Sequence, residues 1–138
     1  MLEPLALLIS ATLFGGMMLY SFGFAAFVFR TLPADEAGAM LRSAFPWYYA
    51  FVVAAGTLSA AVLVPLDPAA AGIIAGAAAS AVYARQLLMP QINAARDRQM
   101  AGDASARARF HMLHGWSVVL NFVQLGAIGY VLTGFVVA

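Results

Sequence analysis

Hydrophobic residues form four long runs along the chain, and short polar segments separate them. The runs cover about residues 4–29, 45–66, 69–89 and 110–138, and the first contains no charged residue. An α-helix rises about 1.5 Å per residue, so about 20 residues cross the roughly 30 Å hydrocarbon core of a bilayer. The pattern therefore predicts an all-α fold, an integral membrane bundle of four transmembrane helices that forms one domain over residues 1–138.

Composition excludes a soluble protein. Hydrophobic residues make up 64% of the chain and charged residues 9%, whereas soluble domains contain about 45–50% apolar and about 25% charged residues. So few charges do not cover the surface of a soluble domain. A membrane β-barrel is excluded as well, because its strands of about 10 residues alternate in polarity and this sequence does not.

Proline, glycine and aspartate mark the expected ends of the helices. Pro46 stands at the start of the second run, so we place it in the first helical turn, where proline is tolerated. Residues 65–68 are expected to form a tight turn, and Pro90 to kink or end the third helix. The polar residues 91–109 are expected to extend the third and fourth helices beyond the membrane, with a break at residues 102–103, where an aspartate side chain can cap the next helix.

The charges indicate the orientation in the membrane. All seven basic residues are arginine, and six of them fall in the two segments that join the first helix to the second and the third to the fourth. These six are Arg30, Arg42, Arg96, Arg98, Arg107 and Arg109. The opposite side carries Glu3 and Asp67 and no basic residue. By the positive-inside rule, both arginine-bearing segments face the cytoplasm and both termini face away from it, in what we expect to be a bacterial inner membrane.

Two features of the sequence concern partners. The basic segments are small and lie next to the membrane, so we expect them to contact membrane lipids through anionic head groups, and no nucleic acid. Gly72 and Gly76 are small residues four apart, a spacing that lets two helix backbones approach closely. We interpret them as packing within the bundle, with a dimer seam as the alternative, so a homo-oligomer or a larger membrane complex stays open.

A polar stripe runs along the fourth helix. His114, Ser117, Asn121 and Gln124 are three, four and three residues apart, so they share one face, and His111 lies at the cytoplasmic edge of that face. A polar group that faces lipid costs free energy unless it finds a partner, so the stripe is expected to point into the bundle. It indicates either a ligand, metal or proton site, or interhelical hydrogen bonds that fix the packing.

The two histidines, His111 and His114, are candidate metal ligands. Side chains three residues apart on one helix can reach the same metal ion in a bundle. The chain has no cysteine, no aspartate or glutamate is expected within the membrane, and its seven methionines suit only a soft metal such as copper. Two histidines one turn apart on one helix cannot bind opposite faces of one haem. The sequence therefore identifies no cofactor.

Arg85 lies about one turn inside the end of the third run. A buried arginine is costly unless it extends its head group to the interface or finds a partner. Arg85 is therefore expected either to reach the cytoplasmic interface or to face the bundle. In the second case it would bind carbonyls, a carboxylate or an anionic ligand near His114.

Catalytic motifs are absent from the sequence. It contains no nucleotide-binding loop, no zinc-protease motif and no paired carboxylates. Ser117 and His114 are close on the helix but lack the acidic residue that orients the histidine of a hydrolase triad. We therefore expect no enzyme.

Four segments lie in order at the ends of the predicted helices. They are Phe29-Arg30-Thr31-Leu32-Pro33, Phe45-Pro46-Trp47-Tyr48, Ala84-Arg85-Gln86-Leu87-Leu88-Met89-Pro90, and residues 109–117 running on to Asn121. Together they resemble the transmembrane protein 205-like family, also described as domain of unknown function 4149, over nearly the whole chain. The resemblance implies a four-span membrane protein of poorly defined activity, with a weak link to resistance against toxic compounds. It also implies a role for a set of residues: Arg30, Pro33, Pro46, Arg85, Pro90, His114, Ser117 and Asn121.

These observations lead to one main hypothesis and two alternatives. The main hypothesis is a binding or transport-associated membrane protein with a polar site inside the bundle. Its candidate ligand-binding residues are Arg85, His114, Ser117, Asn121 and Gln124. The first alternative is a structural subunit or assembly factor of a larger membrane complex. The second is a metal- or haem-binding redox protein that uses His111 and His114.

Overall fold

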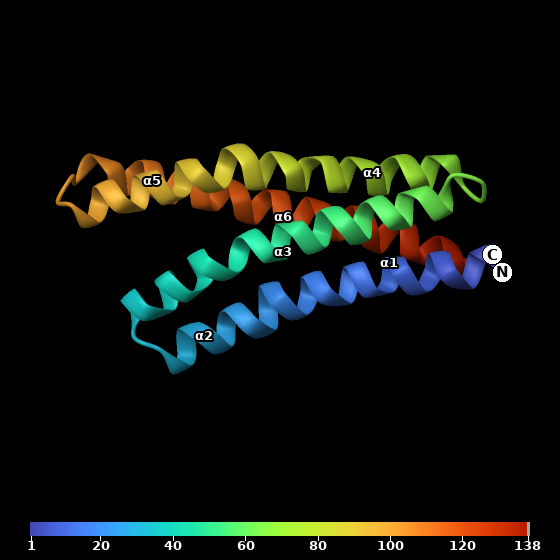
Figure 1. Cartoon of the computed structure of the whole chain (residues 1–138), viewed down its shortest axis with the longest axis horizontal. Coiled ribbons are helices and arrows are strands. Elements are labelled where there is room, and N and C mark those ends of the chain that lie inside the picture. The colour runs from blue at the N-terminus through green and yellow to red at the C-terminus, as the bar shows by residue number, and fades with distance from the viewer. Residues whose placement is uncertain (138) are drawn as a thin grey trace.

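The computed structural model describes residues 1–137, which form four long antiparallel helices joined by short connections (Figure 1). The first consists of α1 (Leu2–Met18), a π-helical segment η1 (Leu19–Phe24) and α2 (Ala25–Thr31), and the second is α3 (Ala34–Leu63). The third consists of α4 (Pro68–Tyr83), a π-helical segment η2 (Ala84–Leu88) and α5 (Met89–Met100). The fourth is α6 (Ser105–Val137). All four are long and apolar enough to cross a membrane. The described chain contains no strand, so the all-α fold and the four candidate spans are confirmed.

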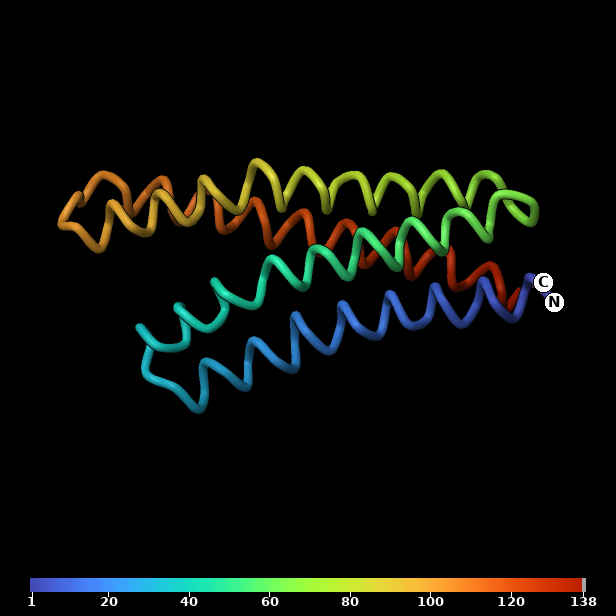
Figure 2. Tube along the Cα trace, in the orientation of Figure 1, coloured from blue at the N-terminus to red at the C-terminus, as the bar shows by residue number. Residues whose placement is uncertain are grey.

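The four helices form a closed ring in the half of the molecule that contains both termini. There α1 packs against α3 and α6, and α4 packs against the same two helices. The core of this half consists of small and branched apolar side chains that are almost completely buried, among them Leu13, Met17, Val52, Leu63, Ile74, Ala81 and Ile128. Both termini and the α3–α4 turn lie at this end, which we call the terminal end (Figure 2).

The ring opens toward the other end, which we call the loop end. In Figure 2 the hairpin of α2 and α3 diverges there from the hairpin of α5 and α6. A second small core of Val28, Ala37 and Leu41 holds α2 against α3. An ion pair crosses the divide, because the guanidinium of Arg42 in α3 donates to both carboxylate oxygens of Asp97 in α5, at 2.5 and 3.1 Å.

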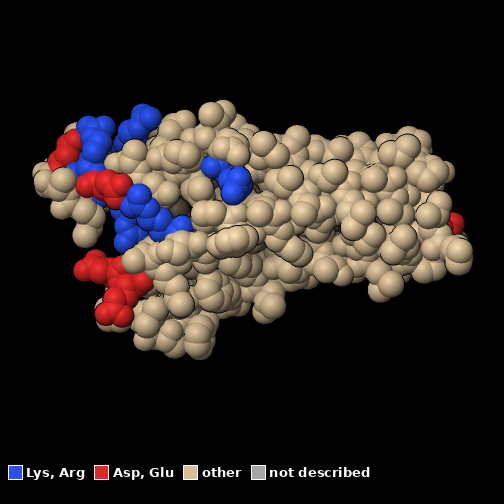
Figure 3. All heavy atoms as spheres, in the orientation of Figure 1, with Lys and Arg blue, Asp and Glu red and all other residues tan. Residues whose placement is uncertain are grey.

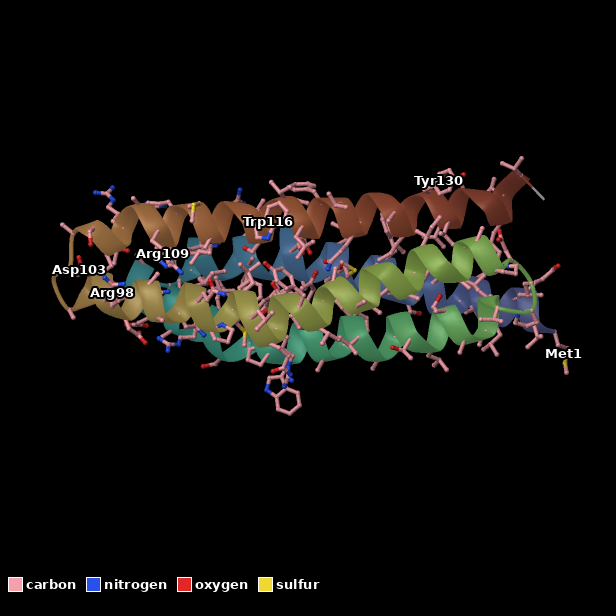
Figure 4. The ribbon with its side chains drawn as sticks, turned by 90° about the horizontal axis from the view of Figure 1, so that it is seen from above. Met1, Arg98, Asp103, Arg109, Trp116 and Tyr130 are labelled. Atoms are coloured by element: carbon pink, nitrogen blue, oxygen red, sulfur yellow. The ribbon has the colours of Figure 1, made fainter. Side chains whose placement is uncertain are left out.

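Charged side chains gather at the loop end. Figure 3 shows arginine, aspartate and glutamate over the two hairpin connections, while the rest of that face is nearly free of charge. Arg98, Asp103 and Arg109 lie at this end and Met1 at the opposite end (Figure 4). The predicted separation of the arginine-bearing connections from the termini is therefore confirmed as geometry, and the side of the membrane that each end faces stays a prediction.

The second helix begins earlier than the sequence predicted. It starts at Ala34, so Pro46 lies in the interior of α3 and its placement in the first turn is wrong. The polar segment before Pro46 is helical because acidic residues in its first turn complement the helix dipole, and because Ala37 and Leu41 bury one face against Val28. The charged residues of this segment are typical of a loop, but its apolar residues lie on one face of a helix.

The third helix continues through Pro90. The helix runs on as α5 to Met100, so of the two expected outcomes an end at Pro90 is wrong. The segment η2 comes immediately before this proline, so the missing N–H of Pro90 falls where the backbone already departs from regular α-helical hydrogen bonding.

Both predicted breaks between helices are confirmed. Asp67 accepts hydrogen bonds from the backbone N–H groups of Ala69 and Ala70, each at 3.0 Å, and so caps α4. Asp103 accepts from the backbone N–H of Ser105 at 3.0 Å and from its hydroxyl at 2.5 Å, and so caps α6. Gly102 before it has a φ of +98°, a conformation that favours glycine.

The interpretation of Gly72 and Gly76 as packing within the bundle is wrong. Both are exposed on α4, and a Cβ added at either position meets nothing within 4 Å. Sequence spacing shows that two residues share a helix face, but it does not show which face is covered. The close approach of α3 to α4 occurs instead at Gly56, where an added Cβ would lie 3.0 Å from the Cβ of Ala78. The dimer seam stays a prediction.

Candidate functional site

Irregular backbone from three of the four helices meets near the middle of the bundle. The segment η1 and the interior proline of α3 are joined by the rings of Tyr20 and Tyr48, which stack with centroids 4.5 Å apart. The segment η2 is joined to the same part of α3 by the Nε of Arg85, which donates to the carbonyl of Pro46 at 3.3 Å. Single π-helical turns inside α-helices recur at functional sites, so this level of the bundle is the place to look for one.

A row of hydrogen bonds crosses the bundle at this level. The hydroxyl of Tyr48 donates to Oδ1 of Asn121 at 2.5 Å, and Nδ2 of Asn121 donates to the hydroxyl of Ser21 at 3.0 Å. Asn121 therefore joins α6 to both α3 and η1. This amide orientation satisfies both neighbours, with Tyr48 as donor and Ser21 as acceptor.

A cavity of about 220 Å³ lies beside this row, which we call the inner cavity. It is bounded by η1 and α2 on one side, by α3 on another and by α6 on the third. Its apolar lining includes Phe22, Phe29, Phe45 and Phe122. The lining residues with a polar group are Tyr20, Ser21, Tyr48, Tyr49, His114, Ser117 and Asn121. Three of the five predicted ligand-binding residues, His114, Ser117 and Asn121, therefore line one space.

A smaller cavity of about 50 Å³ lies between the inner cavity and the loop end. The two cavities share four lining residues, namely Phe45, Tyr49, His114 and Ser117. The smaller one is also lined by Arg42 and Asn93, which lie on α3 and α5. Ser117 turns its hydroxyl to the backbone, donating to the carbonyl of His114 at 2.6 Å, so its own helix already satisfies that donor.

The other two predicted ligand-binding residues lie outside the inner cavity. Gln124 is buried, and its Nε2 donates to the hydroxyl of Ser80 at 2.8 Å, which joins α6 to α4. Arg85 is half-buried on its bond to the Pro46 carbonyl and lines neither cavity. Gln124 therefore has the packing role that was the alternative interpretation, and Arg85 binds a carbonyl within the bundle.

The two histidines differ in their surroundings. Phe110 stacks on His114 with centroids 5.8 Å apart and meets His111 edge-on at 5.6 Å. Both histidines are exposed, but only His114 lines the two cavities. Within residues 1–137 no group of three or more histidine, aspartate or glutamate side chains could hold a metal ion. These histidines therefore lack a third such ligand in the described chain, and we derive no metal chemistry from them.

Two residues that the family resemblance marked lie near the connection between the first and second long helices. Arg30 is exposed in the last turn of α2, where a positive charge complements the helix dipole. Pro33 precedes α3, and its carbonyl accepts from the backbone N–H of Ala37 at 2.9 Å. Both therefore belong to the α2–α3 connection and not to the cavity.

Sequence reasoning missed the tyrosines and Ser21. Tyr48 and Tyr49 follow Trp47 directly in the sequence, yet they are 5% and 8% exposed while Trp47 is 78% exposed. Ser21 follows Tyr20 directly in the first apolar run, and such an adjacent pair of polar side chains in a predicted span was the available signal. The hydroxyl of Tyr20 is buried and has no hydrogen-bond partner among the described residues.

The fold and the cavity define the class: a small helical protein with four candidate membrane spans and a polar cavity between its helices. The chain belongs to the family described as Domain of unknown function (DUF4149), whose profile matches residues 8–101. That match runs from within α1 to the end of α5, so α6 and its polar stripe lie beyond it. No curated protein and no solved structure matches the chain. The transmembrane protein 205-like name stays a resemblance.

Proposed function

We propose that the protein binds a small amphipathic molecule inside the membrane and that this binding serves transport. The observation that carries the proposal is the inner cavity, which joins an aromatic wall to the hydrogen-bonded row of Tyr48, Asn121 and Ser21. Polar groups within a bilayer are costly, and those that line a cavity are candidates for a substrate or ion path. The role is one of binding and not of catalysis.

The size and lining of the inner cavity define the ligand. Pockets for drug-sized molecules measure about 300–1,000 Å³, and the inner cavity at about 220 Å³ is smaller. It suits a molecule of about one ring with one hydrogen-bonding group, such as a phenol. Phe22, Phe45 and Phe122 would contact the ring, and Asn121 would bind the polar group.

Orientation and assembly are part of the proposal. The arginine-rich loop end would face the cytoplasm and both termini would face away from it, as the positive-inside rule expects. Four helices around a small cavity make a thin wall for a complete transporter, so we expect transport to involve an oligomer.

A second candidate function is that of a subunit or assembly factor in a larger membrane complex. The exposed glycines Gly72 and Gly76 on α4 favour it, because a Cβ at either position would meet no atom within 4 Å among the described residues. Native mass spectrometry of protein extracted gently from its own membrane separates the two candidates. A bound small molecule supports the first, and a stoichiometric protein partner supports the second.

The binding proposal is tested with a matched pair of probes, 4-fluorophenol and 4-fluorotoluene. They have similar size, and only the phenol donates a hydrogen bond. In ¹⁹F NMR titrations of protein in lipid nanodiscs, we expect saturable binding of both, with the phenol preferred. One membrane hydrogen bond of about 0.6 kcal/mol corresponds to a preference of about threefold.

The control for this test is a second amide on the same helix. Asn121→Leu is expected to abolish the preference for the phenol, because Asn121 lines the inner cavity. Gln124→Leu also removes one interhelical hydrogen bond, but its side chain lines neither cavity, so the preference is expected to survive. Absence of saturable binding, or an equal loss of preference in both variants, would contradict the proposal.

A further inference from the structure

A second and larger hollow lies on the outside of the bundle, between the first helix and α3, and we call it the outer groove. Its volume is about 500 Å³, and it is lined by Gly16, Leu19, Tyr20, Phe24, Ala44, Trp47, Tyr48 and Phe51. Trp47 is 78% exposed and Leu19 71% exposed, so this groove faces the bilayer. Its lining is apolar apart from the two tyrosine hydroxyl groups, which makes it a surface for molecules that partition into lipid.

The outer groove and the inner cavity have a common wall. Tyr20 and Tyr48 line both spaces, and their rings stack nearly parallel, at 22°. The wall between lipid and the polar row of Asn121 therefore includes this pair of rings. Displacing one ring would connect the two spaces.

We propose that the inner cavity exchanges its ligand sideways with the membrane through the outer groove, and that the ring of Tyr20 is the gate. This inference rests on the proposed binding function and adds the route and the source of the ligand. The ligand is an amphipathic molecule of about one ring that first dissolves in the bilayer. Its apolar part contacts the groove as it passes, and its polar group then hydrogen-bonds to Asn121.

In this proposal Tyr20 is the member of the pair that moves, because its hydroxyl makes no hydrogen bond that the movement would break. The hydroxyl of Tyr48 donates to Asn121, so moving Tyr48 breaks the hydrogen-bonded row. The hydroxyl of Tyr20 has no partner among residues 1–137, so moving Tyr20 breaks no hydrogen bond. Tyr20 also lies in η1, where the backbone departs from the regular helix.

One alternative route leads toward the loop end and is narrower. It leads through the smaller cavity of about 50 Å³, less than a quarter of the inner cavity, and past the side chain of Arg42. That side chain is held by its ion pair with Asp97. A molecule that fills the inner cavity does not fit the smaller one without separation of the two hairpins.

The route is tested by the exchange rates of 4-fluorophenol, measured by ¹⁹F exchange spectroscopy on protein in nanodiscs. We expect Tyr20→Ala to raise association and dissociation rates together, by about tenfold if the ring contributes about 1.4 kcal/mol to the barrier. Tyr20→Phe keeps the ring and removes a hydroxyl that has no partner, so its rates are expected to stay within about twofold of the parent.

A second pair of variants tests the groove without changing the inner cavity. One variant adds a ring inside the groove, and the other adds the same ring outside it as a control. Ala44 lines only the outer groove, so Ala44→Phe is expected to slow association and dissociation by the same factor and leave the affinity unchanged. Ala61→Phe adds the same ring to an exposed position on α3 outside the groove and is expected to change neither rate.

The outcomes separate the route from the binding function. Saturable binding with parental rates in both Tyr20→Ala and Ala44→Phe would overturn the lateral route and leave the binding proposal intact. Faster exchange in Arg42→Ala with no effect of Ala44→Phe would assign exchange to the loop end and overturn the route as well. Absence of saturable binding to the parent protein would overturn both proposals.

Discussion

The two halves of the bundle use polar side chains in different ways. In the terminal half, the hydroxyl groups of Ser10 and Ser59 are fully buried and hydrogen-bond to each other at 2.7 Å between α1 and α3. In the loop half, the row around Asn121 lies along a cavity, and the hydroxyl of Tyr20 has no partner in the described chain. A closed pair fixes packing, whereas polar groups along a cavity remain available to a ligand.

The two halves also differ in how closely their helices pack. In the terminal half four helices close a ring around small side chains, and α3 approaches α4 at Gly56. In the loop half the ring divides into two hairpins joined by the ion pair of Arg42 and Asp97. From this difference we expect the terminal half to resist opening more strongly than the contact between the two hairpins at the loop end.

The largest expected effect comes from the core of the terminal half. Leu13 is completely buried, so Leu13→Ala leaves a cavity there and is expected to destabilise the bundle by about 2 kcal/mol, the low end of the range in soluble cores. The low end applies because lipid is as apolar as leucine and the transfer contribution is small. Equilibrium unfolding in mixed detergent–SDS micelles measures it. Leu8→Ala, at a position 65% exposed, is the control and is expected to change stability by less than about 0.5 kcal/mol.

The next effect concerns the contact between α3 and α4. Gly56→Val places methyl groups against Ala78, where even a Cβ would approach to 3.0 Å, and overpacking of this kind costs about 1–3 kcal/mol. Gly72→Val faces open space on α4, so in the monomer it is expected to be neutral. The same unfolding measurement applies. Equal loss of stability in the two variants in dilute detergent would mean that the exposed face of α4 is covered.

A smaller effect is expected at the divide between the hairpins. The ion pair of Arg42 and Asp97 is partly exposed, so Arg42→Gln is expected to reduce stability by only about 0.2–1 kcal/mol. It should widen the separation of the hairpins more clearly. The chain has no cysteine, so cysteines introduced at the exposed positions Ala39 and Ala101 can be spin-labelled selectively. The two labels report the distance between the ends of the two hairpins. An unchanged distance distribution would mean that other contacts hold the hairpins together.

The smallest effect is at the start of α6. Hydrogen bonds from Ser105, with the charge of Arg98 beside it, lower the pKa of the Asp103 carboxyl below its usual value. A depressed pKa in the folded state stabilises the cap above the pKa of the unfolded chain, and this is lost as the pH falls through the folded value. The protection of the amides of residues 105–107 against hydrogen exchange, taken relative to the intrinsic rate at each pH, is therefore expected to fall at acidic pH. Asp103→Asn should remove that pH dependence, and a dependence that persists would assign it to another group.

The helices and their breaks could be predicted from the sequence because these features are local. Runs of apolar residues report the length of a span, and the caps at Asp67 and Asp103 depend on neighbours two or three residues away. The predicted start of α3 was wrong because the charged residues before Pro46 are typical of a loop. Only the packing against Val28 shows which positions of this segment are buried.

The candidate site could be predicted only in part. The spacing of His114, Ser117 and Asn121 shows that they share a face, and that face does border the inner cavity. The same spacing extended the set to Gln124, which instead binds Ser80 on α4. The stack of Tyr20 on Tyr48 depends on how two helices approach each other, and no local pattern reports that.

The central claim, that the inner cavity binds the polar group of a small amphipathic molecule, is tested most directly at Asn121 itself. The chain has two asparagines, Asn93 and Asn121, so ¹⁵N-asparagine labelling gives two side-chain amide signals, which the Asn121→Leu variant assigns. Asn121 lines the inner cavity, whereas Asn93 lines only the smaller one. We predict that 4-fluorophenol shifts the Asn121 signal saturably, that 4-fluorotoluene shifts it less, and that Asn93 does not move. A shift of Asn93 alone, or of neither amide, would contradict the account.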